Sequence, residues 1–245
     1  MLYWLANLIF QGDFIKEIKK ILKDKKQLIV FDVGCYKGVF TEKIFQIFKS
    51  NIKHIYLFDI NRNVRKYIDK IIKNNKITYN ECALSYKLGT STYNYNQFFE
   101  SAGSSLSNLV KNDKKWNFSR RVLTGNIKNR NTGYQKYTVK TSTLDLFLKK
   151  NKINYIDVCK VDIEGSEIDF LKGSKDTLKK NKIKILSLEI MDNKKNFFKK
   201  EKKIIDFLKK YNFILTKKND IYSISFLSNL KGGDYLFVNK KYSIN

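Results

Sequence analysis

Apolar runs alternate with amphipathic segments along most of this chain of 245 residues. Strand-like runs lie near 77–83, 155–161, 183–190 and 212–217, and helix-like segments lie near 62–74, 143–150, 166–180 and 197–210. Such alternation predicts a parallel sheet with helices on both faces. The last run, 234–238, follows Gly232 and Gly233 without an intervening helix, which favours an antiparallel hairpin. We therefore expect an α/β fold with a Rossmann-like, doubly wound, mostly parallel seven-stranded sheet and an antiparallel edge strand.

A strand, a glycine turn and a helix follow one another near the start of the chain. The apolar run 27–31 leads into Asp32-Val33-Gly34-Cys35-Tyr36-Lys37-Gly38, and a helical period of Phe40, Ile44, Ile47 and Phe48 follows. Glycines let the backbone approach a ligand, and free N–H groups at a helix start favour an anionic group. The next apolar run, 55–58, ends in Asp59, which is 21 residues after Gly38. An acid at this spacing is placed to hold ribose hydroxyls.

The turn indicates which nucleoside cofactor to expect. Dinucleotide sites use Gly-x-Gly-x-x-Gly, whereas this turn is Asp-x-Gly-x-x-x-Gly. An acid before the turn suits the ammonium and sulfonium of S-adenosylmethionine (SAM) better than two phosphates. The structural alternative is that the glycines serve only a tight turn. We predict a SAM pocket whose candidate residues are Asp32, Gly34, Cys35, Lys37 and Gly38 for the methionine end, Asp59 and Ile60 for the ribose, Glu81 and Cys82 for the adenine, and Asp162 beside the sulfonium.

A second junction, Lys160 to Glu167, places three carboxylates where the apolar run 155–161 ends and a helix begins. Ligands of open α/β sheets collect at this edge. Asp162 is the first candidate for a catalytic base or an acceptor-orienting group, and Glu164 and Glu189 are further catalytic candidates, because clustered carboxylates raise one another's proton affinity. For Glu167 we prefer the role of a helix-start acid favoured by the helix dipole.

The same acids offer oxygen ligands for a divalent ion. Asp162, Glu189 and the pair Asp192-Asn193 could together polarise an acceptor hydroxyl through a metal. Three acids at strand ends are not specific for a metal, so the sequence leaves metal dependence open. Lys160, within the strand, is expected to pair with an acid rather than to act on substrate.

The ordered motifs of residues 28–190 resemble those of the FkbM-type methyltransferases. The resemblance is carried by Val30 to Gly38, Tyr56 to Asp59, Cys82 to Ser85, Ser104 to Leu106, Thr143 to Asp145 and Lys160 to Glu167. It implies the class I SAM-dependent methyltransferase fold and methylation of hydroxyl oxygens of sugars or polyketide-type natural products. The chain departs from the family at Cys35 and Tyr36, where small or amide residues are commoner, and at Asp59, which replaces a more usual Glu.

The charge of the chain raises a second functional hypothesis. Lys and Arg total 49 against 23 Asp and Glu, a formal charge of +26, and such a field attracts nucleic acid or anionic membrane. The chain also has no proline and is rich in Lys, Asn and Ile, so base composition explains much of the charge. The alternative is an RNA methyltransferase, although the Asn/Asp-Pro-Pro-Tyr/Phe motif of amino methylation is absent. A non-catalytic SAM-fold binding protein is a third alternative, which the intact turn with Asp59 and Asp162 disfavours.

The predicted organisation is an N-terminal helical extension, 1–26, followed by a methyltransferase domain, 27–245. In the extension, Phe14, Ile15, Ile18, Ile21 and Leu22 form an amphipathic helix that we expect to cover an edge of the sheet, with membrane-surface contact as the alternative. Residues 1–10 are too short to span a bilayer and lack a secretory pattern. The long polar segment 98–133 is interpreted as a substrate lid or insertion over the carboxyl edge, with disorder as the competing interpretation.

Cysteine and histidine usage excludes several classes of site. Cys35, Cys82 and Cys159 are odd in number and lack metal-ligand spacing, so disulfides and a zinc site are not expected. His54 is the only histidine, which disfavours a histidine metal cluster, and we expect it on the surface at a strand entrance. Together these features predict a cytoplasmic O-methyltransferase that uses SAM, without a transmembrane segment.

Overall fold

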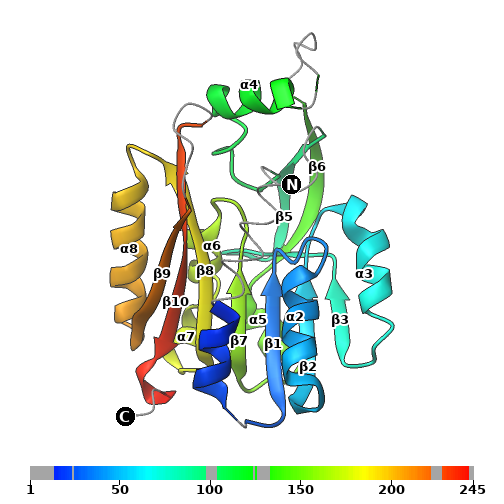
Figure 1. Cartoon of the computed structure of the whole chain (residues 1–245), viewed down its shortest axis with the longest axis vertical. Helices are drawn as coiled ribbons and strands as arrows, with labels where there is room; N and C mark the ends of the chain where they lie inside the picture. The colour runs from blue at the N-terminus through cyan, green and yellow to red at the C-terminus, as the bar shows by residue number, and fades with distance from the viewer. Residues whose placement is uncertain are drawn as a thin grey trace.

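The computed structural model describes residues 14–23, 25–97, 104–123, 125, 133–221 and 228–242. A seven-stranded sheet with the order β3-β2-β1-β7-β8-β10-β9 forms its centre (Figure 1). Its strands are β1 (Leu28–Val33), β2 (Ile52–Phe58), β3 (Ile77–Asn80), β7 (Ile156–Val161), β8 (Ile183–Asn193), β9 (Phe213–Ile221) and β10 (Leu230–Asn239).

The strand directions confirm the predicted α/β fold. Neighbouring pairs among β1, β2, β3, β7 and β8 are parallel, whereas β10 is antiparallel to both β8 and β9. The antiparallel strand expected near the sheet edge is thus β10, and it is inserted between β8 and β9. The outermost strand on this side is β9, because the chain forms β9 at the edge first and then returns as β10 between β9 and β8.

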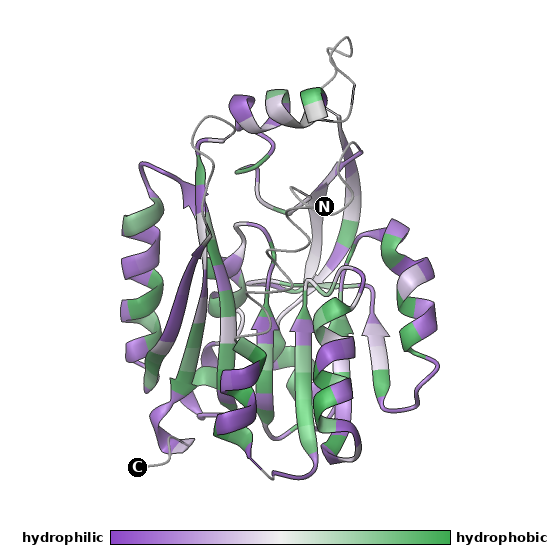
Figure 2. Ribbon diagram, in the orientation of Figure 1, coloured by the Kyte–Doolittle hydropathy of each residue, from purple (hydrophilic) through white to green (hydrophobic). Residues whose placement is uncertain are grey.

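Helices cover both faces of the sheet. One core cluster joins α5 (Leu144–Lys150), α6 (Glu167–Lys172), α7 (Lys175–Lys179) and α8 (Phe197–Lys209) to one face, and the other joins α2 (Val39–Phe48) and α3 (Arg65–Ile71) to the opposite face. Alternate residues of β1 enter the two clusters, Phe31 the first and Val30 the second. Strands buried on both faces read as continuous apolar runs, and this is why the sequence displays them. Figure 2 shows hydrophobic residues concentrated on the central strands and hydrophilic ones on the outer helices.

The helix at residues 14–22 belongs to the core. Phe14, Ile15, Ile18 and Leu22 are buried in the cluster that contains Val30. This helix therefore covers a face of the sheet, and the expectation that it covers an edge was wrong. Its apolar stripe finds a large apolar surface only on the face, because an edge presents backbone groups. The apolar residues 1–10 lie outside the described residues.

A second, three-stranded sheet was not predicted. It consists of β4 (Ala83–Leu84), β5 (Gly89–Asn96) and β6 (Tyr134–Ser142) in the order β4-β6-β5. The expected strand 77–83 is thereby divided between β3 and β4, which pair with different sheets. Within the expected lid segment, α4 (Lys114–Leu123) lies across the carboxyl edge of the main sheet (Figure 1). Its role as a lid stays a prediction.

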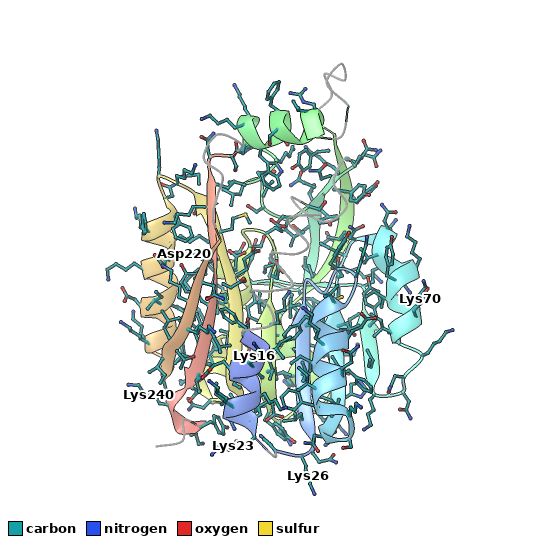
Figure 3. The ribbon with its side chains drawn as sticks, viewed as in Figure 1. Lys16, Lys23, Lys26, Lys70, Asp220 and Lys240 are labelled. Atoms are coloured by element: carbon teal, nitrogen blue, oxygen red, sulfur yellow. The ribbon has the colours of Figure 1, made fainter. Side chains whose placement is uncertain are left out.

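Exposed lysines are spread over separate elements of the surface. Five exposed lysines that project outward from the core are labelled in Figure 3: Lys16, Lys23, Lys26, Lys70 and Lys240.

Ile47 is 42% exposed, although the helical period placed it with the buried residues of α2. None of the helices in the described part of the chain combines the length and apolar character that a membrane crossing requires.

Candidate functional site

The glycine turn after β1 is anchored to both neighbouring strands. The N–H groups of Gly34 and Cys35 donate to Phe58 O at 2.9 and 3.1 Å, and Asp162 N donates to Val33 O at 2.9 Å. Gly34 has φ +76°, and a Cβ on it would lie 1.8 Å from the backbone oxygen of Asp162. Only glycine allows this approach. The turn therefore brings the two sequence junctions into contact at one edge of the sheet.

The second half of the turn leads into α2. Gly38 has φ +77°, and a Cβ on it would meet Ile71 Cδ1 at 2.3 Å. Part of the glycine spacing thus serves helix packing rather than a ligand. Lys37 Nζ lies 4.4 Å from the ring centroid of Tyr67, and burial raises the pKa of the Cys35 thiol well above its usual value. Cys35 is consequently a neutral thiol beneath the turn.

Asp59 joins the turn to the end of β2. Its Oδ2 accepts from Tyr36 N at 2.7 Å and its Oδ1 accepts from Asn61 N at 2.8 Å. Burial raises the pKa of Asp59, although these backbone hydrogen bonds oppose the rise. A carboxylate has about four acceptor sites, so Asp59 can still accept from ribose hydroxyls. Ile60, the next residue, packs beside Tyr93 in a separate apolar cluster.

Asp32 is completely buried beneath the turn. Its Oδ2 accepts from Thr41 Oγ1 at 2.7 Å, while its Oδ1 has no hydrogen-bond partner and lies 3.9 Å from Lys160 Nζ. Burial raises the pKa of Asp32, and the charge of Lys160 opposes this. Sequence reasoning placed Asp32 in contact with the methionine end of SAM. Because no part of the side chain is exposed, we expect it to act through Lys160 and Thr41 instead.

Three carboxyl groups, Asp162, Glu189 and Asp234, form a row across β7, β8 and β10. We call them the carboxylate row. Asp234 pairs with Glu189 in the antiparallel register, and the carboxyl group of Glu189 hydrogen-bonds that of Asp162. Lys160 Nζ donates to Asp162 Oδ2 at 3.0 Å, so Lys160 pairs with an acid as predicted. In Figure 2 the hydrophilic colour appears at the carboxyl ends of β1 and β7.

Sequence reasoning missed Asp234. The available signal was its place at the start of the apolar run 234–238, because a charged residue is costly at the end of a buried strand unless it serves a site. Its partner could not be found from the sequence, since the antiparallel register that sets Asp234 opposite Glu189 depends on tertiary packing.

The pKa values of Asp162 and Glu189, two members of the carboxylate row, are shifted in opposite directions. Burial raises the pKa of Glu189 well above its usual value, and the charges of Asp162 and Glu164 add to this. Burial also acts on Asp162, but the Lys160 charge and hydrogen bonds from Glu189 and Lys160 lower its pKa overall. Asp162 is therefore the ionised member and Glu189 the protonated one. This division favours Asp162 as an orienting group over Asp162 as a base.

The third member of the row predicts a pH dependence of stability. Burial, followed by the charge of Asp162, raises the pKa of Asp234 to about 7, while Lys160 opposes the rise. The folded protein then keeps a proton that the unfolded chain releases near the ordinary value of 3.8, so this stabilisation is complete below that value and declines as pH rises toward 7.

Asp234→Asn is expected to raise the free energy of unfolding at pH 8, because it removes a buried negative charge. At pH 5, where the wild-type carboxyl is mostly protonated, the increase should be smaller. Urea unfolding of both proteins at the two pH values measures the difference. An equal effect at pH 5 and pH 8 would contradict the raised pKa.

The loop between Asp162 and α6 is held from two sides. Ser105 Oγ donates to Ile163 O at 3.0 Å, which ties segment 104–113 to the loop. Glu164 is half-buried in this loop with φ +51°, an uncommon backbone angle for a residue with a side chain. Sequence reasoning missed Ser105 as a support for the catalytic loop, although it lies within a motif of the family resemblance.

Glu167, in the first turn of α6, is also a member of a buried ion pair. Lys200 Nζ donates to Glu167 Oε2 at 2.6 Å, Gly165 O at 3.0 Å and Met191 O at 2.7 Å. Glu167 further accepts from Gly165 N at 2.7 Å. The structural role that we prefer for Glu167 is supported by this ion pair, and its partner, Lys200 on α8, could not be found from the sequence.

Loss of this partner should be strongly destabilising. Lys200→Met leaves the Glu167 charge buried and two carbonyls unpaired, and we expect it to lower the free energy of unfolding by about 3–5 kcal/mol. Lys199→Met, at an exposed neighbouring position, should change it by at most about 0.5 kcal/mol. Urea unfolding measures both. Adding Glu167→Gln to Lys200→Met should recover part of the loss, and no recovery would argue against the unpaired charge as its cause.

The remaining candidates lie at the periphery. Glu81 is exposed and lies 3.5 Å from Arg62 in a surface ion pair, and Cys82 is half-buried after β3. His54, expected on the surface, is half-buried and hydrogen-bonds Thr78 at 2.8 Å. Within the residues that the structure describes, no three His, Cys, Asp or Glu side chains are arranged to hold a metal ion.

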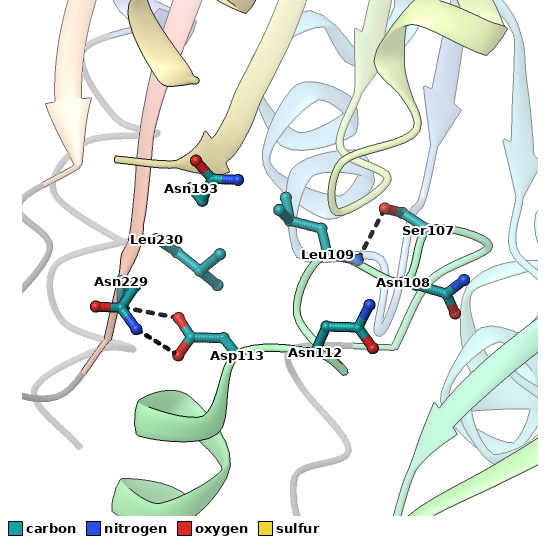
Figure 4. A pocket seen from close by; sticks show the side chains of 8 residues that line it. All are labelled: Ser107, Asn108, Leu109, Asn112, Asp113, Asn193, Asn229 and Leu230. Atoms are coloured by element: carbon teal, nitrogen blue, oxygen red, sulfur yellow. Dashed lines mark hydrogen bonds between the residues drawn. The ribbon is translucent and has the colours of Figure 1, made fainter. Parts of the chain in front are cut away.

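A cavity of about 460 Å³ lies at the same edge of the sheet, under the segment before α4 (Figure 4). It is lined by Ser107, Asn108, Leu109, Asn112, Asp113, Asn193, Asn229 and Leu230. The first five belong to the segment that sequence analysis interpreted as a lid or insertion. Gly165, in the loop between Asp162 and α6, contacts this segment, since a Cβ on it would lie 3.0 Å from Leu109 Cδ2.

A doubly wound sheet with a glycine turn and carboxylates at its carboxyl edge is the arrangement found in SAM-dependent methyltransferases. The family described as Methyltransferase FkbM domain matches residues 32–215. The chain belongs to this family, as the motifs indicated, and SAM is its cofactor. The spare acceptor sites of Asp59, at the edge of the glycine turn, fit the ribose hydroxyls of this cofactor.

Solved structures provide a further comparison. The methyltransferase FkbM from Methylobacillus flagellatus is similar in fold, with 10% identity and a TM-score of 0.51 over 86% of this chain. This chain spans 43% of that protein's length. A putative tRNA (m1A22) methyltransferase from Streptococcus pneumoniae has 8% identity and a TM-score of 0.45, with 94% of this chain and 71% of that chain covered. No curated protein matched the chain.

Proposed function

We propose that this methyltransferase transfers a methyl group to a hydroxyl oxygen of a sugar, a glycan or a small natural product. The observation that supports this most is the carboxylate row, which combines an ionised carboxylate with two raised pKa values at the edge where the glycine turn ends. Oxygen methylation needs such a group, because the acceptor must lose a proton as its oxygen attacks.

Binding of the donor falls to the first junction. The backbone of the glycine turn surrounds the methionine end, and Asp59 accepts from the ribose hydroxyls. Bound SAM supplies a methyl group on a positively charged sulfur. The negative charges of Asp59 and Asp162 favour that charge at the edge of the sheet. Glu81 and Cys82 remain candidates for the adenine side.

Activation of the acceptor falls to the second junction. Asp162 accepts a hydrogen bond from the acceptor hydroxyl and orients its oxygen for in-line attack. Bound SAM would supply the methyl group, and the carboxylate row would take up the proton that the acceptor hydroxyl loses. Asp234, with a pKa of about 7, is the member best matched to hold it near neutral pH. Glu164 contributes a further negative charge beside Glu189.

The acceptor edge favours a neutral hydroxyl compound over RNA. RNA requires cationic groups for its phosphates, but no Lys or Arg lines the cavity beside the catalytic loop. The exposed Lys114 and Lys115 lie on α4 next to the cavity but outside its lining, and the lysines labelled in Figure 3 lie on other elements. The free thiols Cys35, Cys82 and Cys159 support a cytoplasmic location, where thiols stay reduced.

The deciding experiment supplies labelled SAM and compares methyl incorporation into hydroxylated metabolites, cell-surface glycans and RNA. We expect base-stable label, as in a methyl ether, on a glycan or a metabolite. Incorporation into RNA alone would overturn the proposal. A parallel reaction with a chelator, with and without added magnesium, tests whether Asp162, Glu189 and Asp192 use a metal.

A further inference from the structure

The cavity beside segment 107–113 offers hydrogen-bonding groups to a ligand but no free charge. Four of its eight lining residues are asparagines, one is a serine and two are leucines. In a chain where 49 of 245 residues are Lys or Arg, none of the eight is basic. A ligand here is recognised by amide and hydroxyl groups and by two apolar side chains.

Asp113, the one acid that lines the cavity, uses both of its carboxylate oxygens in hydrogen bonds within the protein. Asp113 Oδ1 accepts from Lys115 N and Trp116 N at the start of α4, and its Oδ2 accepts from Asn229 N at 2.8 Å and Ser228 Oγ at 3.1 Å. Figure 4 shows its contact with Asn229 at one side of the cavity. Asp113 therefore ties α4 to β10 and builds the wall instead of presenting a charge.

Three amide groups remain for a ligand, those of Asn108, Asn112 and Asn193. Asn108 Oδ1 accepts from Asn94 Nδ2 at 3.1 Å, but the NH₂ of Asn108 has no acceptor among the described residues. The described structure contains no acceptor for the side-chain NH₂ of Asn112 or of Asn193. Leu109 and Leu230 supply an apolar surface beside them. Amide donors beside an apolar patch suit a sugar ring, which carries hydroxyls at its rim and C–H groups on its faces.

One wall of the cavity lies away from the reacting groups. Asn193 and Leu230 pair with each other, and they lie four residues beyond Glu189 and Asp234, which also pair. At about 3.3 Å per residue, the backbone of Asn193 and Leu230, which form one wall of the cavity, lies about 13 Å along the strands from Glu189 and Asp234. A single sugar ring is shorter than this separation. One ring that binds against Asn193 and Leu230 therefore cannot also present a hydroxyl to Asp162.

From this separation we infer that the acceptor is a neutral oligosaccharide: one sugar unit binds in the cavity while a hydroxyl of another unit reaches Asp162. This inference rests on the proposed function, since it concerns the acceptor of the same reaction. The cavity is then a binding subsite that selects for chain length and for neutral units. Asn108, Asn112 and Asn193 are its hydrogen-bonding residues.

The test uses the full chain with SAM and an array of neutral glycans, graded from one to six sugar units. We expect binding and methyl incorporation to rise with length and to be weak for single sugars. Asn112→Leu, at an exposed position, should weaken binding of the longer glycans about tenfold, the loss that corresponds to about 1.4 kcal/mol. Binding of SAM and of single sugars should not change. Asn193→Leu is the second variant, and Lys114→Ala, on the same segment but outside the lining, is the matched control.

The outcomes separate the subsite from the proposed function. Methyl transfer to hydroxyls without dependence on length, or with Asn112→Leu and Asn193→Leu both equal to wild type, overturns the subsite only. Glycan binding that depends on Asn112 without methyl transfer to any hydroxyl keeps the subsite and overturns the proposed function. If no glycan of the array binds, the subsite is overturned. It is also overturned if an oligoribonucleotide binds to the wild-type protein and Asn112→Leu abolishes that binding.

Discussion

Asp162→Asn is expected to lower the rate of methyl transfer by about a hundredfold, the scale of the loss when a reacting group is no longer oriented for attack. Asp162 is the ionised member of the carboxylate row, because Lys160 and Glu189 both hydrogen-bond its carboxylate. The amide keeps the shape of the side chain but removes the charge, so the acceptor hydroxyl loses its anionic partner. Glu189 also loses the neighbour that helps to keep it protonated.

Binding of SAM should survive this substitution. Apart from the charge of Asp162, the groups assigned to the donor lie on the glycine turn and on Asp59, which hydrogen-bonds Tyr36 and Asn61 rather than Asp162. Calorimetry with SAM and a single-turnover assay with the best acceptor measure the two effects. Asp169→Asn on α6, where the carboxylate pairs with exposed Lys172, is the matched control. Wild-type turnover in Asp162→Asn would move the orienting role to another residue.

Asp59→Ala is expected to lower the affinity for SAM by about tenfold or more. This is the loss that corresponds to about 1.5–3 kcal/mol, the contribution of a hydrogen bond to a charged group. Two effects add. The ribose hydroxyls lose their acceptor, and Tyr36 N loses the hydrogen bond that holds the glycine turn against β2. Both act on the donor and neither touches the carboxylate row.

Calorimetry on Asp59→Ala and on Asp59→Asn separates these contributions, because Asn retains one oxygen for the turn. Asp69→Ala on α3, an exposed acid paired with Arg65, serves as the control. Urea unfolding of each variant shows whether the turn remains folded. Affinity equal to wild type in a folded Asp59→Ala protein would contradict the ribose assignment.

The order and type of the main elements were predictable because their signals are local. Apolar runs such as 183–190 occupy strands that are buried on both faces, and α8 shows the period of a helix with one buried face. The carboxyl edge followed from the same reasoning, since parallel strands end at one edge. Asp162 and Glu189 could therefore be placed near each other without coordinates.

Other features depended on contacts between distant residues. The second sheet pairs β5 with β6 across a long intervening segment, and nothing local marks that pairing. The helix at residues 14–22 has an apolar stripe that fits an edge or a face equally well as a pattern. Its position on the face was decided by the surface available beside Val30.

The sequence by itself determined the class of fold, the family and the two junctions that form the site, because each of these depends on residues close together in the chain. Only the tertiary structure showed that Asp32 is sealed beneath the turn, that Asp234 completes the carboxylate row, and that Lys200 neutralises Glu167. These depend on burial and on register between strands and helices, which arise when distant segments pack.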